Sequence, residues 1–205
     1  MVIGGQDTDI KDVPYQVEFA FNGELGCGGA IVNSRYIVTA GHCVRGRTVS
    51  QITIRVGSNQ AGQGKVYQIS NLQAHPKFKL DPNTGIDFDI ALIQTPEPIA
   101  FSDSLKPVPL VDTSASLGDM GLLSGWGATT TSRHYPQTLQ FFICALNPGG
   151  GIGSCYGDSG GPLVVNGKLA GTVSGGLECA GADDPGTYAD VGHPEIRSWI
   201  KITGV

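Results

Sequence analysis

The stretch Gly157-Asp158-Ser159-Gly160-Gly161-Pro162 decides how this chain is interpreted. Glycines on both sides leave the Ser159 hydroxyl approachable, and they free nearby backbone amides to bind an anion. A serine hydroxyl is a weak nucleophile by itself, so it needs a base within hydrogen-bond reach. The stretch therefore predicts a nucleophilic serine, with the backbone amides of Gly157 and Ser159 as donors to an oxyanion.

The base is predicted to be His42, in the segment Thr39–Cys43. An unperturbed imidazole titrates at about pH 6.5, which suits proton transfer near neutrality. The other histidines lie in turns flanked by Pro or Tyr or close to them, and we interpret them as surface residues: His75, His134 and His193.

The acid that would orient His42 is predicted to be Asp89, directly before the apolar run Ile90–Ile93. A carboxylate at the mouth of a buried strand needs a partner, and an imidazole N–H supplies one. Asp87 is the competing acid, and Asp89 is favoured because it abuts the strand. Ser174 is a candidate hydrogen-bond partner for Asp89 from the second half of the chain.

Composition indicates a β-rich protein. Among the 205 residues are 31 Gly and 12 Pro, and charged residues make up only 15%. This pattern favours short strands joined by tight turns over a helical bundle. The net charge of −5 without a basic stripe argues against nucleic acid or an anionic membrane as partner, and no apolar run is long enough to span a bilayer.

The five cysteines form no C-x-x-C pair, which argues against a zinc site. Their wide spacing in a Gly-rich β chain indicates disulfides and an oxidising compartment, and the odd count leaves one cysteine without a partner.

The pattern of apolar residues predicts ten strands and one helix. The helix begins at Pro194 and ends at Gly204, and Asn166-Gly167 is a hairpin turn. The predicted strands cover residues 15–21, 36–39, 51–56, 66–72, 90–94, 122–126, 138–143, 162–165, 168–174 and 187–191.

Two other functions fit parts of the pattern. The stretch around Ser159 also fits the G-x-S-x-G elbow of esterases, with Asp183 or Asp190 and His193 downstream. That elbow must lead from a strand into a helix, whereas a strand and a hairpin follow here. The second alternative is an impaired or inactive protease homologue that acts as a binding module.

Several motifs in one order make the chain resemble the trypsin/chymotrypsin-type serine endopeptidases almost from end to end. Within this family, the chain resembles the subtype of invertebrate chymotrypsin-like digestive enzymes. The matching segments are Val2–Gly5, Cys27–Gly29, Thr39–Cys43, Asp89–Leu92, Gly125–Gly127, Gly157–Pro162 and Ser198–Ile200.

The resemblance implies an all-β peptidase domain over residues 2–205, with two antiparallel six-stranded β-barrels and the active site in the cleft between them. The first barrel would cover residues 15–101, the second 117–192 and a C-terminal helix 193–203. The implied catalytic triad is His42, Asp89 and Ser159, with Gly157 and Ser159 as oxyanion donors. The implied disulfides are Cys27–Cys43 and Cys155–Cys179.

The resemblance also implies a secreted, monomeric enzyme that acts on protein or peptide substrates, is open to protein inhibitors and needs no cofactor or metal. Its signal and propeptide would lie outside this chain. Zymogen cleavage would free the amine of Val2 to pair with Asp158, which requires removal of Met1.

The matching specificity residues are Gly153, Ser154, Ser174, Gly176 and Gly186. Because Gly153 stands where a trypsin has Asp, we expect a preference for a large apolar or aromatic side chain at the P1 position, the residue before the cleaved bond.

Two further departures from the family pattern affect the second half. Gly175 replaces a Trp beside the substrate backbone, which weakens the expected binding of extended peptides. The join from Thr138 to Cys144 lacks on the order of twenty residues that contain a strand and a cysteine. This predicts a second barrel without one strand and a free, reactive thiol at Cys144.

Overall fold

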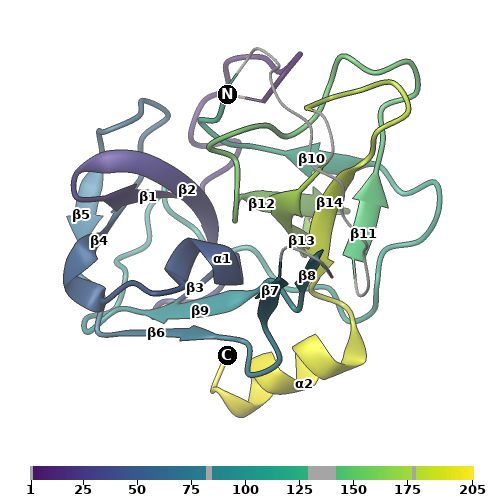
Figure 1. Ribbon diagram of the computed structural model, residues 1–205. Coiled ribbons are helices and arrows are strands. Elements are labelled where there is room, and N and C mark those ends of the chain that lie inside the picture. The colour runs from purple at the N-terminus through teal and green to yellow at the C-terminus, as the bar shows by residue number, and fades with distance from the viewer. Residues whose placement is uncertain (1, 82–84, 129–141, 177–178) are drawn as a thin grey trace.

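The structure is a computed structural model that describes residues 2–81, 85–128, 142–176 and 179–205. Two curled antiparallel sheets lie side by side, and one helix packs below them at the C-terminus (Figure 1). The protein thus has the all-β fold that the sequence predicts.

The first sheet has the strand order β5-β4-β1-β2-β3-β9-β6. Its strands are β1 (Gln16–Phe21), β2 (Glu24–Ile31), β3 (Tyr36–Thr39), β4 (Ile52–Val56), β5 (Lys65–Tyr67), β6 (Asn71–Ala74) and β9 (Ala91–Gln94). The two end strands, β5 and β6, are separated by only residues 68–70, so they bring the two edges of the sheet together.

The prediction of one continuous strand over residues 66–72 is therefore wrong, because two short strands, β5 and β6, occupy this segment. The chain bends between β5, which pairs with β4, and β6, which pairs with β9. A straight strand cannot pair with both neighbours, because β4 and β9 lie on opposite sides of the bend.

Strand β2 is absent from the sequence prediction, because Gly26, Gly28 and Gly29 are poor strand formers. The structure explains these glycines by close approach. A Cβ on Gly29 would lie 2.6 Å from the Phe19 ring, and one on Gly28 would lie 3.0 Å from the Gly161 backbone.

The second sheet has the order β10-β12-β13-β14-β11 in the described part of the chain. Its strands are β10 (Gly121–Leu123), β11 (Phe142–Ala145), β12 (Pro162–Val165), β13 (Lys168–Gly175) and β14 (Gly186–Asp190). The predicted hairpin is present, with positive φ angles of 50° at Asn166 and 74° at Gly167 between β12 and β13. Most of the strand predicted over residues 138–143 lies outside the described residues.

Smaller elements complete the fold. The helical turn α1 (Gly41–Val44) follows β3, η1 (Val49–Gln51) precedes β4, and β7 (Lys79–Asp81) pairs with β8 (Gly85–Asp87). Helix α2 (Pro194–Ile202) begins at its proline as predicted, and it buries Ile196, Trp199 and Ile200.

Two large cores stabilise this arrangement. One fills the first barrel around Phe19, Ile37 and Ile54. The other joins both sheets, because Val38 and Ala30 share it with Leu169, Val164 and the buried face of α2. Among the described helices, none has the length and apolar character that a bilayer crossing requires.

Candidate active site

His42 and Asp89 are in direct contact. Nδ1 of His42 donates a hydrogen bond to Oδ2 of Asp89 at 2.7 Å, and the backbone amide of His42 donates to Oδ1 at 2.8 Å. The hydroxyl of Ser174 donates to Oδ2 as well. Asp89 is fully buried, and these three donors compensate for the loss of water around its charge. The two-point contact fixes the orientation of the imidazole.

The competing acid, Asp87, lies at the end of β8. Its carboxylate accepts a hydrogen bond from the backbone amide of Phe88 at 2.9 Å. Burial is the largest influence on the pKa of Asp87 and raises it.

The pKa of His42 results from two opposing influences. Burial is the larger single influence and would lower it, but the charge and the hydrogen bond of Asp89 together raise it above the ordinary value of 6.5. An imidazole held in this way accepts a proton more readily than one in water.

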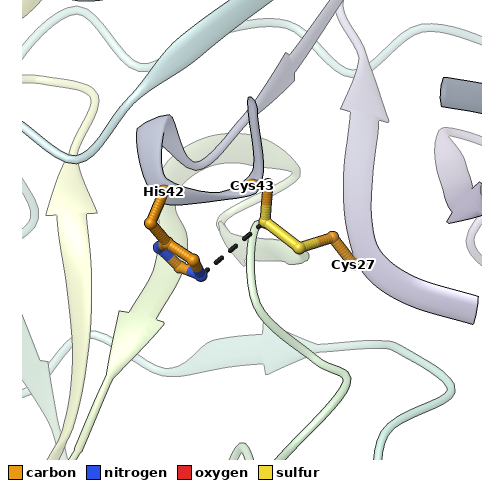
Figure 2. Close-up of side chains that lie close together, drawn as sticks. All are labelled: Cys27, His42 and Cys43. Atoms are coloured by element: carbon orange, nitrogen blue, oxygen red, sulfur yellow. Dashed lines mark hydrogen bonds between the residues drawn. A yellow bond between two sulfur atoms is a disulfide. The ribbon is translucent and has the colours of Figure 1, made fainter. Parts of the chain in front are cut away.

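The loop that carries His42 is tied to β2 by the disulfide Cys27–Cys43. Nε2 of His42 lies 3.7 Å from Sγ of Cys43. Figure 2 shows the imidazole turned toward this disulfide. Cys27, His42 and Cys43 place one potential metal-ligand atom each within 4.8 Å of one another. Both sulfurs are bonded in the disulfide, so neither offers the thiolate that a zinc ion requires. This cluster is therefore a disulfide beside an imidazole.

Ser159 lies in the loop before β12 and is half-buried. Its carbonyl accepts a hydrogen bond from the amide of Gly28 at 2.7 Å. Gly28 follows Cys27, so this bond brings the serine loop next to the disulfide and the His42 turn. In the described part of the chain, no hydrogen bond joins the His42 imidazole to the Ser159 hydroxyl. Such contacts are often long without substrate and tighten in the complex.

The glycines around Ser159 are required by conformation and space. Gly157 has φ +91°, and Gly160 has φ +76°, both in the region that side chains disfavour. A Cβ on Gly160 would lie 2.2 Å from Oγ1 of Thr39. Within the described residues, the backbone amides of Gly157 and Ser159 donate no hydrogen bond, so both are available to an anion.

Asp158 is fully buried beneath this loop. Its carboxylate accepts hydrogen bonds from the amides of Gly127 at 2.8 Å and Cys155 at 3.0 Å. Burial raises the pKa of Asp158, and these hydrogen bonds oppose that rise. A Cβ on Gly125 or Gly127 would approach the carboxylate to 2.3 or 2.5 Å, so both glycines of the Gly-Trp-Gly motif make room for it.

The N-terminal segment reaches this region. Ile3 and Gly153 exchange two backbone hydrogen bonds, of 3.1 and 3.2 Å. The disulfide Cys155–Cys179 closes the neighbouring loop. Both disulfide pairings are the ones that the resemblance implied, and the remaining cysteine, Cys144, is free and exposed.

Two of the predicted specificity residues, Ser154 and Gly186, lie beside Tyr188, which was not among the residues predicted from the sequence. The hydroxyl of Tyr188 is hydrogen-bonded to Ser154, and burial raises its pKa. A Cβ on Gly186 would lie 2.9 Å from this hydroxyl and 3.1 Å from the Ser154 hydroxyl. Ser174 and Gly176 lie at the end of β13 and just after it. Residues 187–190 of β14 are all buried, so burial on both faces of the strand, and not alternation, encloses Tyr188.

Of the histidines predicted to lie on the surface, His75 does not. His75 is buried, at 6% exposure, because it packs under α2 between Phe88 and Trp199. The surface interpretation of His75 is therefore wrong. His193 is half-buried at the start of α2, and His134 lies outside the described residues.

The esterase alternative requires a helix directly after the serine turn. The structure has strand β12 there, followed by the hairpin to β13. This geometry excludes the esterase elbow.

Comparisons with known proteins agree with this geometry. The trypsin family profile matches residues 2–142 and 133–200. The vitellin-degrading protease of Bombyx mori is 35% identical over 226 residues, which cover 97% of this chain and 84% of that protein. Trypsin 5G1 of Aedes aegypti is 34% identical over 229 residues, which cover 98% of this chain and 84% of that protein.

Among solved structures, neuropsin, a serine protease expressed in the limbic system of mouse brain, superimposes with a TM-score of 0.83 at 27% identity. The match covers 97% of this chain and 98% of neuropsin. The alignment with the Bombyx mori protease spans 226 positions, which is 21 more than the 205 residues of this chain. At least 21 residues of that protease therefore have no aligned residue in this chain. From fold, site geometry and relatives together, the chain belongs to the trypsin family and is a serine endopeptidase.

Proposed function

We propose that Ser159 is the nucleophile, His42 the general base and Asp89 the acid that orients His42. The observation that carries this proposal is the two-point contact between His42 and the buried Asp89 carboxylate, next to a serine loop bonded to Gly28. His42 takes the hydroxyl proton as Ser159 attacks the peptide carbonyl, and it returns that proton to the leaving amine. Water then hydrolyses the acyl-enzyme.

Asp89 stabilises the charged imidazole that forms during each proton transfer. Its charge and hydrogen bond raise the pKa of His42 against the opposing effect of burial. The Nδ1 contact also selects the tautomer in which Nε2 is free to accept the serine proton.

The oxyanion of the tetrahedral intermediate binds the amides of Gly157 and Ser159. Support comes from the positive φ of Gly157 and from the lack of other acceptors for these two amides among the described residues. Donors fixed in advance need no reorganisation when the negative charge develops.

Activation pairs the amine of Val2 with Asp158 in protein that begins at Val2. Support comes from the two backbone bonds between Ile3 and Gly153, close in sequence to both partners, and from the burial of Asp158. A buried carboxylate needs a counter-charge, and the ordered pair would hold the Gly157 amide in place.

The specificity pocket is lined by Gly153, Ser154, Ser174, Gly176 and Gly186, with Tyr188 beside them. No carboxylate belongs to this set, so a cationic side chain finds no partner and a large apolar or aromatic P1 residue is preferred. Protein or peptide substrates, protein inhibitors, a monomeric state and secretion complete the proposal. The disulfides support an oxidising compartment.

An active-site phosphonate tests the triad. Protein beginning at Val2 should be labelled at Ser159 with a stoichiometry near one, and Ser159→Ala should remain unlabelled. No labelling of correctly folded protein with a free Val2 amine would overturn the proposal and favour a binding module.

Peptide substrates that differ only at P1 test the pocket. We expect kcat/KM for Phe or Leu to exceed that for Arg by at least tenfold, the scale of one pocket contact. A preference for Arg or Lys would contradict the neutral pocket and leave the triad assignment untouched.

A further inference from the structure

Phe88 has an unusual backbone conformation directly before Asp89. Its φ is +46°, in the left-handed region, which costs a side-chain-bearing residue about 1–2 kcal/mol. Among the described residues, the other non-glycine positions with positive φ are Asn22, Asn166 and Ala180. Asparagine tolerates this region, whereas an aromatic residue does not do so readily. Something in the structure must hold Phe88 there.

The Phe88 side chain is fixed by a stack with His75. The two ring centroids lie 4.6 Å apart with an interplanar angle of 8°. Phe88 is only 4% exposed. His75 is fixed in turn by an edge contact to Trp199 of α2, at 4.9 Å between centroids. The ammonium of Lys77 lies over the Phe88 ring, 5.4 Å from its centroid.

The backbone on both sides of Asp89 depends on this anchor. The amide of Ile90 donates to the carbonyl of Phe88 at 2.8 Å, which closes a tight turn around Asp89. The amide of His75 donates to the carbonyl of Ile90 at 2.9 Å. His75 therefore holds the residue before Asp89 through its ring and the residue after it through its backbone.

The turn sets the direction of the Asp89 carboxylate. Both carboxylate oxygens are engaged by His42, at 2.7 and 2.8 Å, so a small rotation of the turn would break one contact or both. Hydrogen bonds weaken steeply once distance and angle leave their narrow range.

We propose that the Phe88–His75 stack is a positioning device that holds Asp89 in its two-point contact with His42, and that Phe88 and His75 are positioning residues of the reaction. The proposal rests on the function proposed above, because the turn matters for catalysis only if Asp89 orients the base. It assigns a role to two residues that touch neither the substrate nor the reacting atoms.

Four variants separate the effect of the ring stack from the effect of the strained backbone at Phe88. Phe88→Leu removes the stack and keeps the strained φ, Phe88→Gly removes both the stack and the strain, and His75→Leu removes the stack from the other side. His75→Phe keeps a flat ring and should rescue the function of the stack. Phe101→Leu, at a ring that is 46% exposed, is the matched control.

The decisive readout is the pKa of the His42 imidazole, followed by NMR titration on a Ser159→Ala background. We expect the raised pKa of His42 to fall toward or below 6.5 in the Leu and Gly variants and to stay raised in His75→Phe and Phe101→Leu. This measurement requires no enzymatic activity, so it remains informative if the phosphonate test fails.

Kinetics with the intact Ser159 give the second readout. We expect kcat to fall roughly tenfold to a hundredfold in Phe88→Leu and His75→Leu with KM within twofold, since a misplaced base affects the transition state. An unchanged His42 pKa and unchanged kcat in folded Phe88→Leu and His75→Leu would overturn the positioning role, while labelling of Ser159 would still support the triad. Activity restored in Phe88→Gly would show that strain, and not the stack, controls Asp89, and would also overturn the proposal.

Discussion

The backbone amide of Gly28 donates a hydrogen bond to the carbonyl of Ser159 at 2.7 Å, and this bond links the two halves of the molecule at the candidate active site. Gly28 belongs to β2 of the first sheet, whereas Ser159 leads into β12 of the second. A Cβ on Gly28 would lie 3.0 Å from Cα of Gly161 and 3.2 Å from its nitrogen, so no side chain fits without moving the serine loop.

Replacement of Gly28 by Ala should therefore impair catalysis, because the added Cβ would displace the loop that carries Ser159. We expect kcat to fall roughly tenfold with a smaller change in KM, because a shift of a few tenths of an ångström displaces the nucleophile. Steady-state hydrolysis of a peptide substrate measures both constants. Gly121→Ala is the control, since the atoms nearest to its Cβ would belong to the side chains of Leu163 and Val165 and not to the backbone. Equal effects of both changes would contradict a specific role for the Gly28 contact.

The contact between His42 and Asp89 should appear in the pH dependence of stability. The pKa of His42 in the folded state is raised above its ordinary 6.5, so the folded protein binds the proton more tightly than the unfolded chain. The resulting stabilisation is fully present below the unfolded-state pKa, and it is lost as the pH rises through the folded-state pKa.

Unfolding of the wild type and of His42→Gln by denaturant, from about pH 5 to about pH 8, measures this effect. The difference in free energy of unfolding should be largest at the acid end and shrink as the pH rises. Burial also raises the pKa of Asp158, but its titration is common to both proteins and cancels in the difference. A difference that grows with pH would show that the sign of the His42 shift is wrong.

Cys144 should react as a free thiol. It is exposed on β11, and the other four cysteines are joined in the two disulfides. A maleimide should modify the native, unreduced protein once, and Cys144→Ser should abolish the modification. Native protein that takes up no label would mean that Cys144 is blocked or paired.

Glu18 should contribute to the stability of the first barrel. It is only 2% exposed, and its carboxylate accepts a hydrogen bond from Arg55 at 2.9 Å and one from the amide of Gly62 at 2.7 Å. Glu18→Gln leaves Arg55 without its charge partner, and we expect a loss of about 2 kcal/mol or more in the free energy of unfolding.

The exposed pair of Asp103 and Lys106, at 3.4 Å, supplies the control for Glu18. Asp103→Asn should change stability little, because solvent screens this pair. Similar losses in both variants, measured by urea denaturation, would argue against a special contribution of the buried pair.

Local signals explain which elements the sequence predicted well. Asn166-Gly167 requires two consecutive positive φ angles, and Pro194 suits the first turn of a helix, so the hairpin and α2 follow from chemistry within a few residues. Strand β2 was missed for the opposite reason. Its glycines disfavour a strand locally, and they are explained only by Phe19 and Gly161, which lie on other segments.

By itself, the sequence determined the kinds of side chain, their order and the tight turns, and these sufficed to predict the family and to favour Asp89 over Asp87. Only the tertiary structure decided that β5 and β6 form the two edges of the first sheet, that His75 is buried against Phe88, and that Tyr188 contacts Ser154. Turn conformations depend on the residues within the turn, whereas these three features depend on contacts between segments that only the folded chain brings together.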